Sequence, residues 1–353
     1  MIFKGEKYKV ALLLGAGATR GALRGVSRPV IRAPLNKDFF EVAKRFISCP
    51  EGEKYKNCLV RVNKFISDQM MPVDKKQPTM EEVFSTLFMS KDLPVIFKTG
   101  RGRIRKEGFR PEIRDFLVLL IAIFRFLQMN LKHKDNIDHY ARLVAKLEEG
   151  DSIITLNYDT LVDNALLGVG WRPENGYGFN ASSKIIYSNL RAVKRRFKNV
   201  YLLKPHGSLN WFARGKISNL EETLSRKNVS RIDIANAPRL YTLKQDKYVR
   251  FFIPPLYTKF FNNDFWRYLW HESYLRLKNC NCLIIIGCSL ITTDYHLRAI
   301  LSKVLKSKKK FKKIIIVDKN LKVVGNLKKF FRGASFSGCE TYNTFTEYIE
   351  SLN

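Results

Sequence analysis

The feature that most constrains the fold is a series of short, continuously apolar segments, each followed by a turn and a helix-like pattern. Such β-branched runs, alternating with helices, are typical of strands that are buried on both faces of a mostly parallel sheet. The pattern predicts an α/β fold with a Rossmann-like sheet and helices on both faces. The runs are Lys9–Leu14, Ser152–Leu156, Val200–Leu203, Val249–Ile253, Cys282–Ile286 and Ile314–Val317.

A long stretch between the first two strands, about residues 35–150, has helical patterns instead. Thr79 and Glu82 have the spacing of a capping box, and Pro111–Asn130 is apolar enough for a buried helix. Tyr140–Glu149 precedes Gly150, a residue that often ends helices. We therefore expect a single domain over residues 1–353 with a helical subdomain inserted at 35–150, and no further domain after the last strand and helix.

The composition is that of a globular protein, with 45% hydrophobic residues. The longest apolar run, Phe116–Phe124, is far shorter than the roughly 20 residues of a membrane span. No signal-peptide pattern precedes the first strand, and the six cysteines form no Cys-x-x-Cys pair. We expect a cytoplasmic protein with reduced thiols and no membrane contact.

The net charge is strongly positive, at +31, from 63 basic and 32 acidic side chains. Such an excess favours nucleic acid or an acidic protein as a partner, although a solvated basic surface without a partner explains it equally well. No helix-turn-helix, zinc-finger or RNP-type motif accompanies the charge. The basic residues cluster at Lys303, Lys306, Lys308, Lys309, Lys310, Lys312 and Lys313, at Arg101, Arg103, Arg105, Lys106, Arg110 and Arg114, and at Arg191, Lys194, Arg195, Arg196 and Lys198.

A glycine-rich turn follows the first predicted strand directly. Small residues there let the backbone approach a pyrophosphate group, whose charge is favoured by the amides at a helix start. A plain strand-to-helix turn is the alternative. The turn lacks the full Gly-x-Gly-x-x-Gly of dehydrogenases, which argues against redox chemistry. Its residues are Gly15, Ala16, Gly17, Ala18 and Thr19.

Polar side chains follow the next two predicted strands. Asn157 and Asp159 come after the second strand, where an amide and a carboxylate can hold a ribose and position a water molecule. Asp159 or Thr160 can instead cap the next helix. His206 follows the third strand within Lys-Pro-His-Gly-Ser, a position suited to a general base or a hydroxyl partner.

Two later strand ends carry small or hydrogen-bonding residues. Gly287 and Ser289 follow the strand Cys282–Ile286, with Asp294 a few residues further on. Asp318 follows the last strand and can accept a hydrogen bond from a ribose hydroxyl. These positions suit the adenosine half of a dinucleotide.

Taken in order, these segments resemble the Sir2 superfamily, and more narrowly the Sir2-like domains of bacterial and archaeal defence proteins. Each segment alone is unspecific, but the ordered set covers residues 9–318. The segments that carry the resemblance are Gly15-Ala16-Gly17-Ala18, Leu156-Asn157-Tyr158-Asp159, Lys204-Pro205-His206-Gly207-Ser208-Leu209-Asn210-Trp211, Ile253-Pro254-Pro255 and Gly287-Cys288-Ser289-Leu290 with Asp294.

Two departures separate the chain from sirtuin deacylases. Sirtuins carry Gly-Ile-Pro-Asp-Phe-Arg after the glycine turn, whereas the region here reads Gly21-Ala22-Leu23-Arg24-Gly25-Val26. Sirtuins usually have four zinc-binding cysteines after the His-Gly pair, whereas no cysteine lies between His206 and Cys280. Because a structural zinc site needs four ligands, no zinc is expected, and a deacylase role is in doubt.

The resemblance implies an NAD⁺ glycohydrolase that cleaves NAD to nicotinamide and ADP-ribose, with NAD as substrate. It assigns catalysis to Asn157 and His206, and NAD binding to the glycine turn, Asp159, Gly287, Ser289, Asp294 and Asp318. It further implies a gated effector of anti-phage defence, controlled by homo-oligomerisation or by a partner such as a HerA-type helicase or a short Argonaute system. The alternatives are an NAD-dependent protein deacylase and a catalytically silent scaffold that binds nucleotide or nucleic acid.

Overall fold

The computed structural model describes most of the chain. The described residues are 2–3, 6–23, 31–70, 77–90, 110–130, 138–187, 199–216, 220–235, 247–258, 262–291, 293–307, 311–332 and 336–352. Of the basic stretches, residues 101–106, 191–198 and 308–310 lie outside these ranges, as does the segment 24–26 that departs from the sirtuin pattern.

The main sheet has six parallel strands in the order β12-β11-β10-β3-β4-β6. The predicted Rossmann-like parallel sheet is thereby confirmed. Five of the predicted apolar runs contain or overlap its strands, and the edge strand β12 was not anticipated. The bounds are β3 Val10–Leu14, β4 Ser152–Thr155, β6 Tyr201–Leu203, β10 Cys282–Ile286, β11 Phe311–Val317 and β12 Phe336–Tyr342.

Helices cover both faces of this sheet, and alternate strand residues point to each face. On one face Leu13 and Ile285 pack with α10 Asp264–Asn279, α11 Tyr295–Lys306 and α12 Leu321–Phe331. On the other, Leu12 and Ile284 share a core with the remaining sheet helices. These are α1 Ala16–Ala22, α6 Asp138–Ala145, α7 Leu161–Gly168 and α13 Phe345–Glu350.

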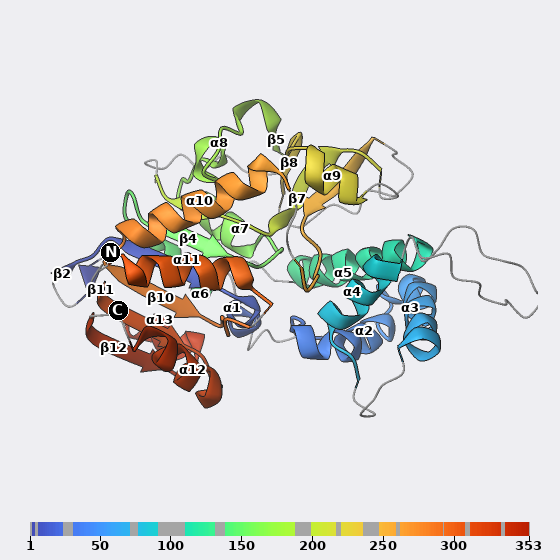
Figure 1. Ribbon diagram of the computed structural model, residues 1–353, viewed down its shortest axis with the longest axis horizontal. Helices are drawn as coiled ribbons and strands as arrows, with labels where there is room; N and C mark the ends of the chain where they lie inside the picture. The colour runs from blue at the N-terminus through green and yellow to red at the C-terminus, as the bar shows by residue number, and fades with distance from the viewer. Residues whose placement is uncertain are drawn as a thin grey trace, which may run out of the picture.

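Most of the helices between β3 and β4 gather beside the sheet (Figure 1). They bury Phe39, Phe84 and Phe116 against one another in a core continuous with one face of the sheet. The predicted capping box is confirmed, because the Thr79 N–H donates to Glu82 and the Glu82 N–H donates to Thr79 Oγ1. The elements are η1 Asn36–Asp38, α2 Phe39–Ile47, η2 Glu53–Tyr55, α3 Lys56–Gln69, α4 Met80–Ser90 and α5 Arg110–Met129.

The helix predicted to run as far as Glu149 ends earlier, at Ala145. The Asp151 carboxylate accepts hydrogen bonds from the N–H groups of Glu148 and Val10, and these bonds favour a turn over further helix. Gly150 therefore belongs to the turn before β4, with φ of 84°, and does not cap the helix.

The run Val249–Ile253 does not join the parallel sheet. It forms β9, Tyr248–Phe252, in a separate four-stranded sheet of order β5-β8-β7-β9. β9 pairs antiparallel with β7, which begins at Gly207 immediately after His206. The remaining elements are β1 Ile2–Phe3, β2 Glu6–Lys7, α8 Pro173–Gly176, η3 Ser182–Lys184, β5 Ile185–Tyr187, β7 Gly207–Arg214, α9 Leu220–Arg226 and β8 Arg231–Ile234. Within the described ranges, no helix is both long enough and apolar enough to cross a bilayer.

Candidate active site

A cavity of about 530 Å³ opens at the carboxyl ends of β3, β4, β10 and β11. Ligands of open α/β sheets bind at this edge. The cavity brings together eleven of the twelve candidate residues that the sequence singled out. These are Gly15, Ala16, Gly17, Thr19, Asn157, Asp159, His206, Gly287, Ser289, Asp294 and Asp318.

Ala18 is the candidate that does not line the cavity. Its side chain is fully buried in the core beneath α1. Its N–H donates to the Gly15 carbonyl at 2.9 Å, which closes the glycine turn. Ala18 therefore stabilises the glycine turn from the core side and does not face the cavity.

Backbone contact between the β3–α1 turn and the end of β10 explains the glycines. The Gly15 N–H donates to the Ile286 carbonyl at 3.1 Å, and the Gly17 N–H donates to the Gly287 carbonyl at 3.0 Å. Gly287 has φ of 56°, and a Cβ there would lie 2.2 Å from the Ala18 nitrogen. Only glycine fits this crossing, because any side chain would separate the two turns that form the floor of the cavity.

Asn157 is held by the glycine turn and the first helix. Its Nδ2 donates to the Gly15 carbonyl and to Thr19 Oγ1, both at 2.9 Å. Thr19 Oγ1 in turn donates to Asp159 Oδ2 at 2.7 Å. The other oxygen of Asp159 accepts from the Leu161 N–H at 3.1 Å, at the start of α7. Asp159 thus accepts from the first N–H of that helix and fixes the polar chain that orients the Asn157 amide.

A buried lysine, Lys204, contacts the backbone of Asp159 and the side chain of Asp163. Lys204 Nζ donates to the Asp159 carbonyl oxygen at 2.6 Å and contacts Asp163 Oδ2 at 3.0 Å. Tyr177 Oη donates to the other oxygen of Asp163 at 2.5 Å. Burial raises the pKa of Asp159, although the Lys204 charge and the Thr19 hydrogen bond oppose that rise.

His206 reaches the cavity from the loop between the two sheets. Its side chain is buried, with an exposed fraction of 4%, and it meets Trp270 of α10 edge-on at 5.8 Å between ring centroids. Its carbonyl accepts from the Ile253 N–H at 2.8 Å. Gly207, with φ of 79°, then starts β7, and a Cβ there would lie 2.5 Å from the Phe251 carbonyl oxygen. These contacts place His206 in the lining of the same cavity as Asn157.

The later candidates also line the cavity. Asp318 Oδ1 accepts from the Asn320 N–H at 2.8 Å, and burial raises the pKa of Asp318. Asp294 is buried and precedes α11. Burial, followed by the carboxylates of Glu81 and Asp294, raises the pKa of Tyr158 well above its usual value.

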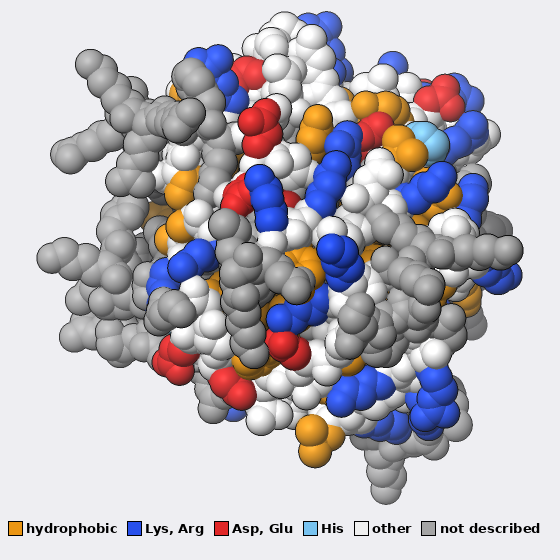
Figure 2. Space-filling view, turned by 90° about the vertical axis from the view of Figure 1, so that its left-hand side faces the viewer, with side chains coloured by type: hydrophobic (Ala, Val, Ile, Leu, Met, Phe, Trp, Pro, Cys, Tyr) orange, Lys and Arg blue, Asp and Glu red, His pale blue; other side chains and the backbone are white. Residues whose placement is uncertain are grey.

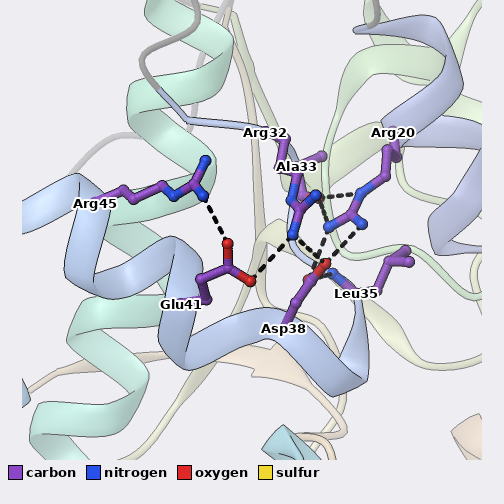
Figure 3. A network of polar contacts seen from close by, with 7 residues as sticks. All are labelled: Arg20, Arg32, Ala33, Leu35, Asp38, Glu41 and Arg45. Carbon is purple, nitrogen blue, oxygen red and sulfur yellow. Dashed lines mark hydrogen bonds and ion pairs between the residues drawn. The ribbon is translucent and has the colours of Figure 1, made fainter.

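Sequence reasoning missed a second wall, contributed by the chain between β3 and β4. Residues 34–37 line the cavity together with Arg20 and Glu81. Arg20 makes a two-bonded ion pair with Asp38 and also donates to the Ala33 carbonyl (Figure 3). Burial would raise the pKa of Asp38, but Arg20 and the Leu35 N–H hold it below its usual value. No local sequence pattern predicts these contacts. They join residues that are far apart in the sequence, and the residues of this wall do not directly follow a strand.

The described residues of the predicted basic clusters differ in their exposure to solvent. Lys303, Lys306 and Lys312 are exposed, whereas Lys313 is buried and pairs with Glu340 at 2.8 Å. Figure 2 shows Lys and Arg side chains spread over one face of the molecule with acidic side chains between them. Among the described residues, no group of three or more His, Cys, Asp or Glu side chains could hold a metal ion.

Comparison with known proteins gives one family. Residues 151–332 match the model of the SIR2-like domain. A comparison with curated proteins finds no match. Among solved structures, a Sir2 homologue in complex with NAD is 12% identical, with a TM-score of 0.38 over 98% of this chain and 88% of that one. A Sir2 complex with a p53 peptide and NAD⁺ is 14% identical, with a TM-score of 0.35 over 97% and 91%.

Proposed function

Because the chain belongs to the SIR2-like family, we propose that it is an NAD-utilising enzyme and, more narrowly, an NAD⁺ glycohydrolase. The observation that carries the proposal is the polar chain from Asn157 through Thr19 to Asp159, with His206 in the same cavity. Family membership supports NAD-dependent chemistry in general. The hydrolytic outcome rests on the side chains that face the cavity.

The glycine turn would hold the pyrophosphate of NAD. The small residues Gly15, Ala16 and Gly17 let a diphosphate approach the backbone closely, with Thr19 on the next turn of α1. Gly287, Ser289 and Asp318 would hold the adenosine half. Asp294 would bind on the same side, and Asp159 would order the loop or contact ribose.

The reaction breaks the bond between C1′ of the ribose and the nicotinamide nitrogen. The bonding electron pair leaves with nicotinamide, and the sugar passes through an oxocarbenium-like transition state. A water oxygen then bonds to C1′, and its proton must be removed. Asn157 would hold the ribose and this water, and His206 would engage a ribose hydroxyl and assist removal of the proton.

We also propose that this activity is controlled, because unrestrained cleavage would deplete the cell of NAD. We propose that homo-oligomerisation, or a partner such as a HerA-type helicase or a short Argonaute system, gates the enzyme in anti-phage defence. The positive charge of the chain suits an acidic protein or a nucleic acid as that partner. Sedimentation that finds an isolated monomer with full NADase activity would contradict the gating.

The test is chromatography of the products that the purified chain releases from NAD. The wild type is assayed alone and with a candidate partner, and in the condition that activates it the products should be nicotinamide and ADP-ribose in equal amounts. Asn157→Ala and His206→Ala should each lose about 10²-fold or more in kcat, as expected for a lost positioning or proton-transfer group. Wild-type rates in either variant would contradict the assignment, and acyl-lysine turnover would favour a deacylase.

A further inference from the structure

Glu81 is a carboxylate of the cavity wall that the proposed reaction does not use. It is the second residue of α4, has an exposed fraction of 5%, and lines the cavity. A buried carboxylate needs hydrogen-bond donors. Its donors come from two other parts of the chain.

The first donor is Asn36, at the start of η1. Asn36 Nδ2 donates to Glu81 Oε2 at 3.2 Å, and the Glu81 N–H donates to Asn36 Oδ1 at 2.9 Å. This reciprocal pair joins α4 to the segment 34–37, which forms part of the cavity wall. The other side of that segment is held by Arg20, through the Ala33 carbonyl and Asp38 (Figure 3).

The second donor is Thr293, which lies next to Asp294. Thr293 Oγ1 donates to the same oxygen, Glu81 Oε2, at 3.0 Å. One carboxylate oxygen therefore joins three segments that are distant in sequence: the wall at 34–37, helix α4, and the turn that carries Asp294. One turn further along α4, Ser85 Oγ accepts from the Tyr257 N–H at 2.9 Å, which links this helix to the segment after β9, where Pro255 lines the cavity.

We propose that Glu81 is a positioning residue for NAD, which holds the 34–37 wall and the Asp294 turn at the spacing that the substrate requires. The inference rests on the proposed function, since it names what this wall does in that reaction. Hydrogen bonds to a charged group are among the stronger contacts in proteins, so their loss should release both segments. The cavity would then bind NAD less well although the core beneath it remains packed.

The geometry predicts an ordered series of variants. Both donors meet a single oxygen, so Glu81→Gln can keep both hydrogen bonds through its amide oxygen. We expect its KM for NAD to stay within about threefold of wild type. Glu81→Leu keeps the bulk but removes the oxygen that accepts both hydrogen bonds, and its KM should rise on the order of tenfold or more, with a smaller change in kcat.

Thr293→Val tests the contact from the other side, in case Glu81→Leu folds poorly. It removes one donor at nearly constant volume and should raise KM in the same direction. The double variant Glu81→Leu, Thr293→Val should be no worse than Glu81→Leu alone, because the two changes remove the same contact. Additive losses would contradict a role through this bond.

Glu82→Leu is the matched control on the same helix turn. It removes the carboxylate that caps α4 through Thr79 and should lower the melting temperature, while the KM for NAD stays at the wild-type value. A merely structural role for Glu81 would give the same result in Glu81→Leu: a lower melting temperature with unchanged KM. That outcome would overturn the proposal, as would a Glu81→Gln variant as impaired as Glu81→Leu.

Calorimetric titration of NAD, run beside the turnover assay, separates this inference from the function on which it rests. Wild-type protein that neither binds NAD nor releases nicotinamide would overturn the proposed function and the inference with it. Wild-type binding with equal NAD affinity in Glu81→Leu and Thr293→Val would overturn the inference alone. Weaker binding in both variants, and near-normal binding in Glu81→Gln, is the result we expect.

Discussion

At the scale of single residues, the site depends on side chains with more than one contact. Asp159 accepts from the Leu161 N–H of α7 through Oδ1 and from Thr19 through Oδ2, and Thr19 in turn accepts from Asn157. We therefore expect that replacing any one of them would change the orientation of the others. Sequence reasoning found these residues because each lies at a strand end or in the turn that follows it. It missed Glu81 and Arg20, because their place in the cavity depends on contacts that only the folded chain forms.

Gly287→Ala should disrupt both the fold and the site. The new Cβ would lie 2.2 Å from the Ala18 nitrogen at a positive φ, so the two turns must separate. We expect the free energy of unfolding to fall by more than about 3 kcal/mol, measured by urea denaturation. Gly325→Ala in α12 is the control, because its Cβ meets nothing within 4 Å. It should gain about 0.5–1 kcal/mol of stability, and equal effects in the two variants would contradict this account.

Lys204→Met should be strongly destabilising. Lys204 has no exposed surface, and its removal leaves the buried Asp163 carboxylate without its cation. Loss of one partner of a buried ion pair typically costs about 3–5 kcal/mol, because the remaining charge is uncompensated. Urea denaturation at neutral pH measures the change. Adding Asp163→Leu should recover part of the loss, whereas a single-variant loss below about 1 kcal/mol would show that the pair matters little.

At the scale of elements, five strands of the parallel sheet were predictable because they are largely apolar and alternate with helices. The edge strand β12 was not, because its sequence Phe-Ser-Gly-Cys-Glu-Thr-Tyr is mostly polar or small. The second sheet was not predictable in the same way. Its strand β7 contains Gly207, Asn210 and Arg214 among apolar residues, so it shows neither a continuous run nor a clean alternation. Val249–Ile253 has the composition of a central strand, but its partner is β7, and strand pairing is not encoded in local pattern.

The contact between α1 and η1 predicts a pH dependence. The pKa of Asp38 is lowered in the folded state, so ionised Asp38 contributes stability above its unfolded pKa, and this contribution is lost as pH falls through the folded value. Asp38→Asn should therefore cost on the order of 1.5 kcal/mol near pH 6, and the difference from wild type should shrink below about pH 4. Urea denaturation across this range measures it. A difference that stays constant down to pH 3 would contradict the Arg20–Asp38 pairing as its cause.

At the scale of the whole molecule, one core spans a face of the sheet and the helices between β3 and β4. We propose that these helices form an inserted part of a single domain, so the chain should unfold in one transition. Phe116→Ala in α5 should lower the melting temperature for signals from both regions together, with a loss of about 3–5 kcal/mol. Near-UV and far-UV circular dichroism measure this. Two separate transitions would show that the helices fold as an independent unit.

The central claim is that the cavity at the end of the sheet hydrolyses NAD. The most direct measurement is mass spectrometry of the products after the purified chain, with any required partner, acts on NAD in water labelled with heavy oxygen. The account predicts unlabelled nicotinamide and ADP-ribose that carries one heavy oxygen, both lost in His206→Ala. Nicotinamide without labelled ADP-ribose would mean that water is not the acceptor, and NAD recovered intact under every condition would contradict the claim.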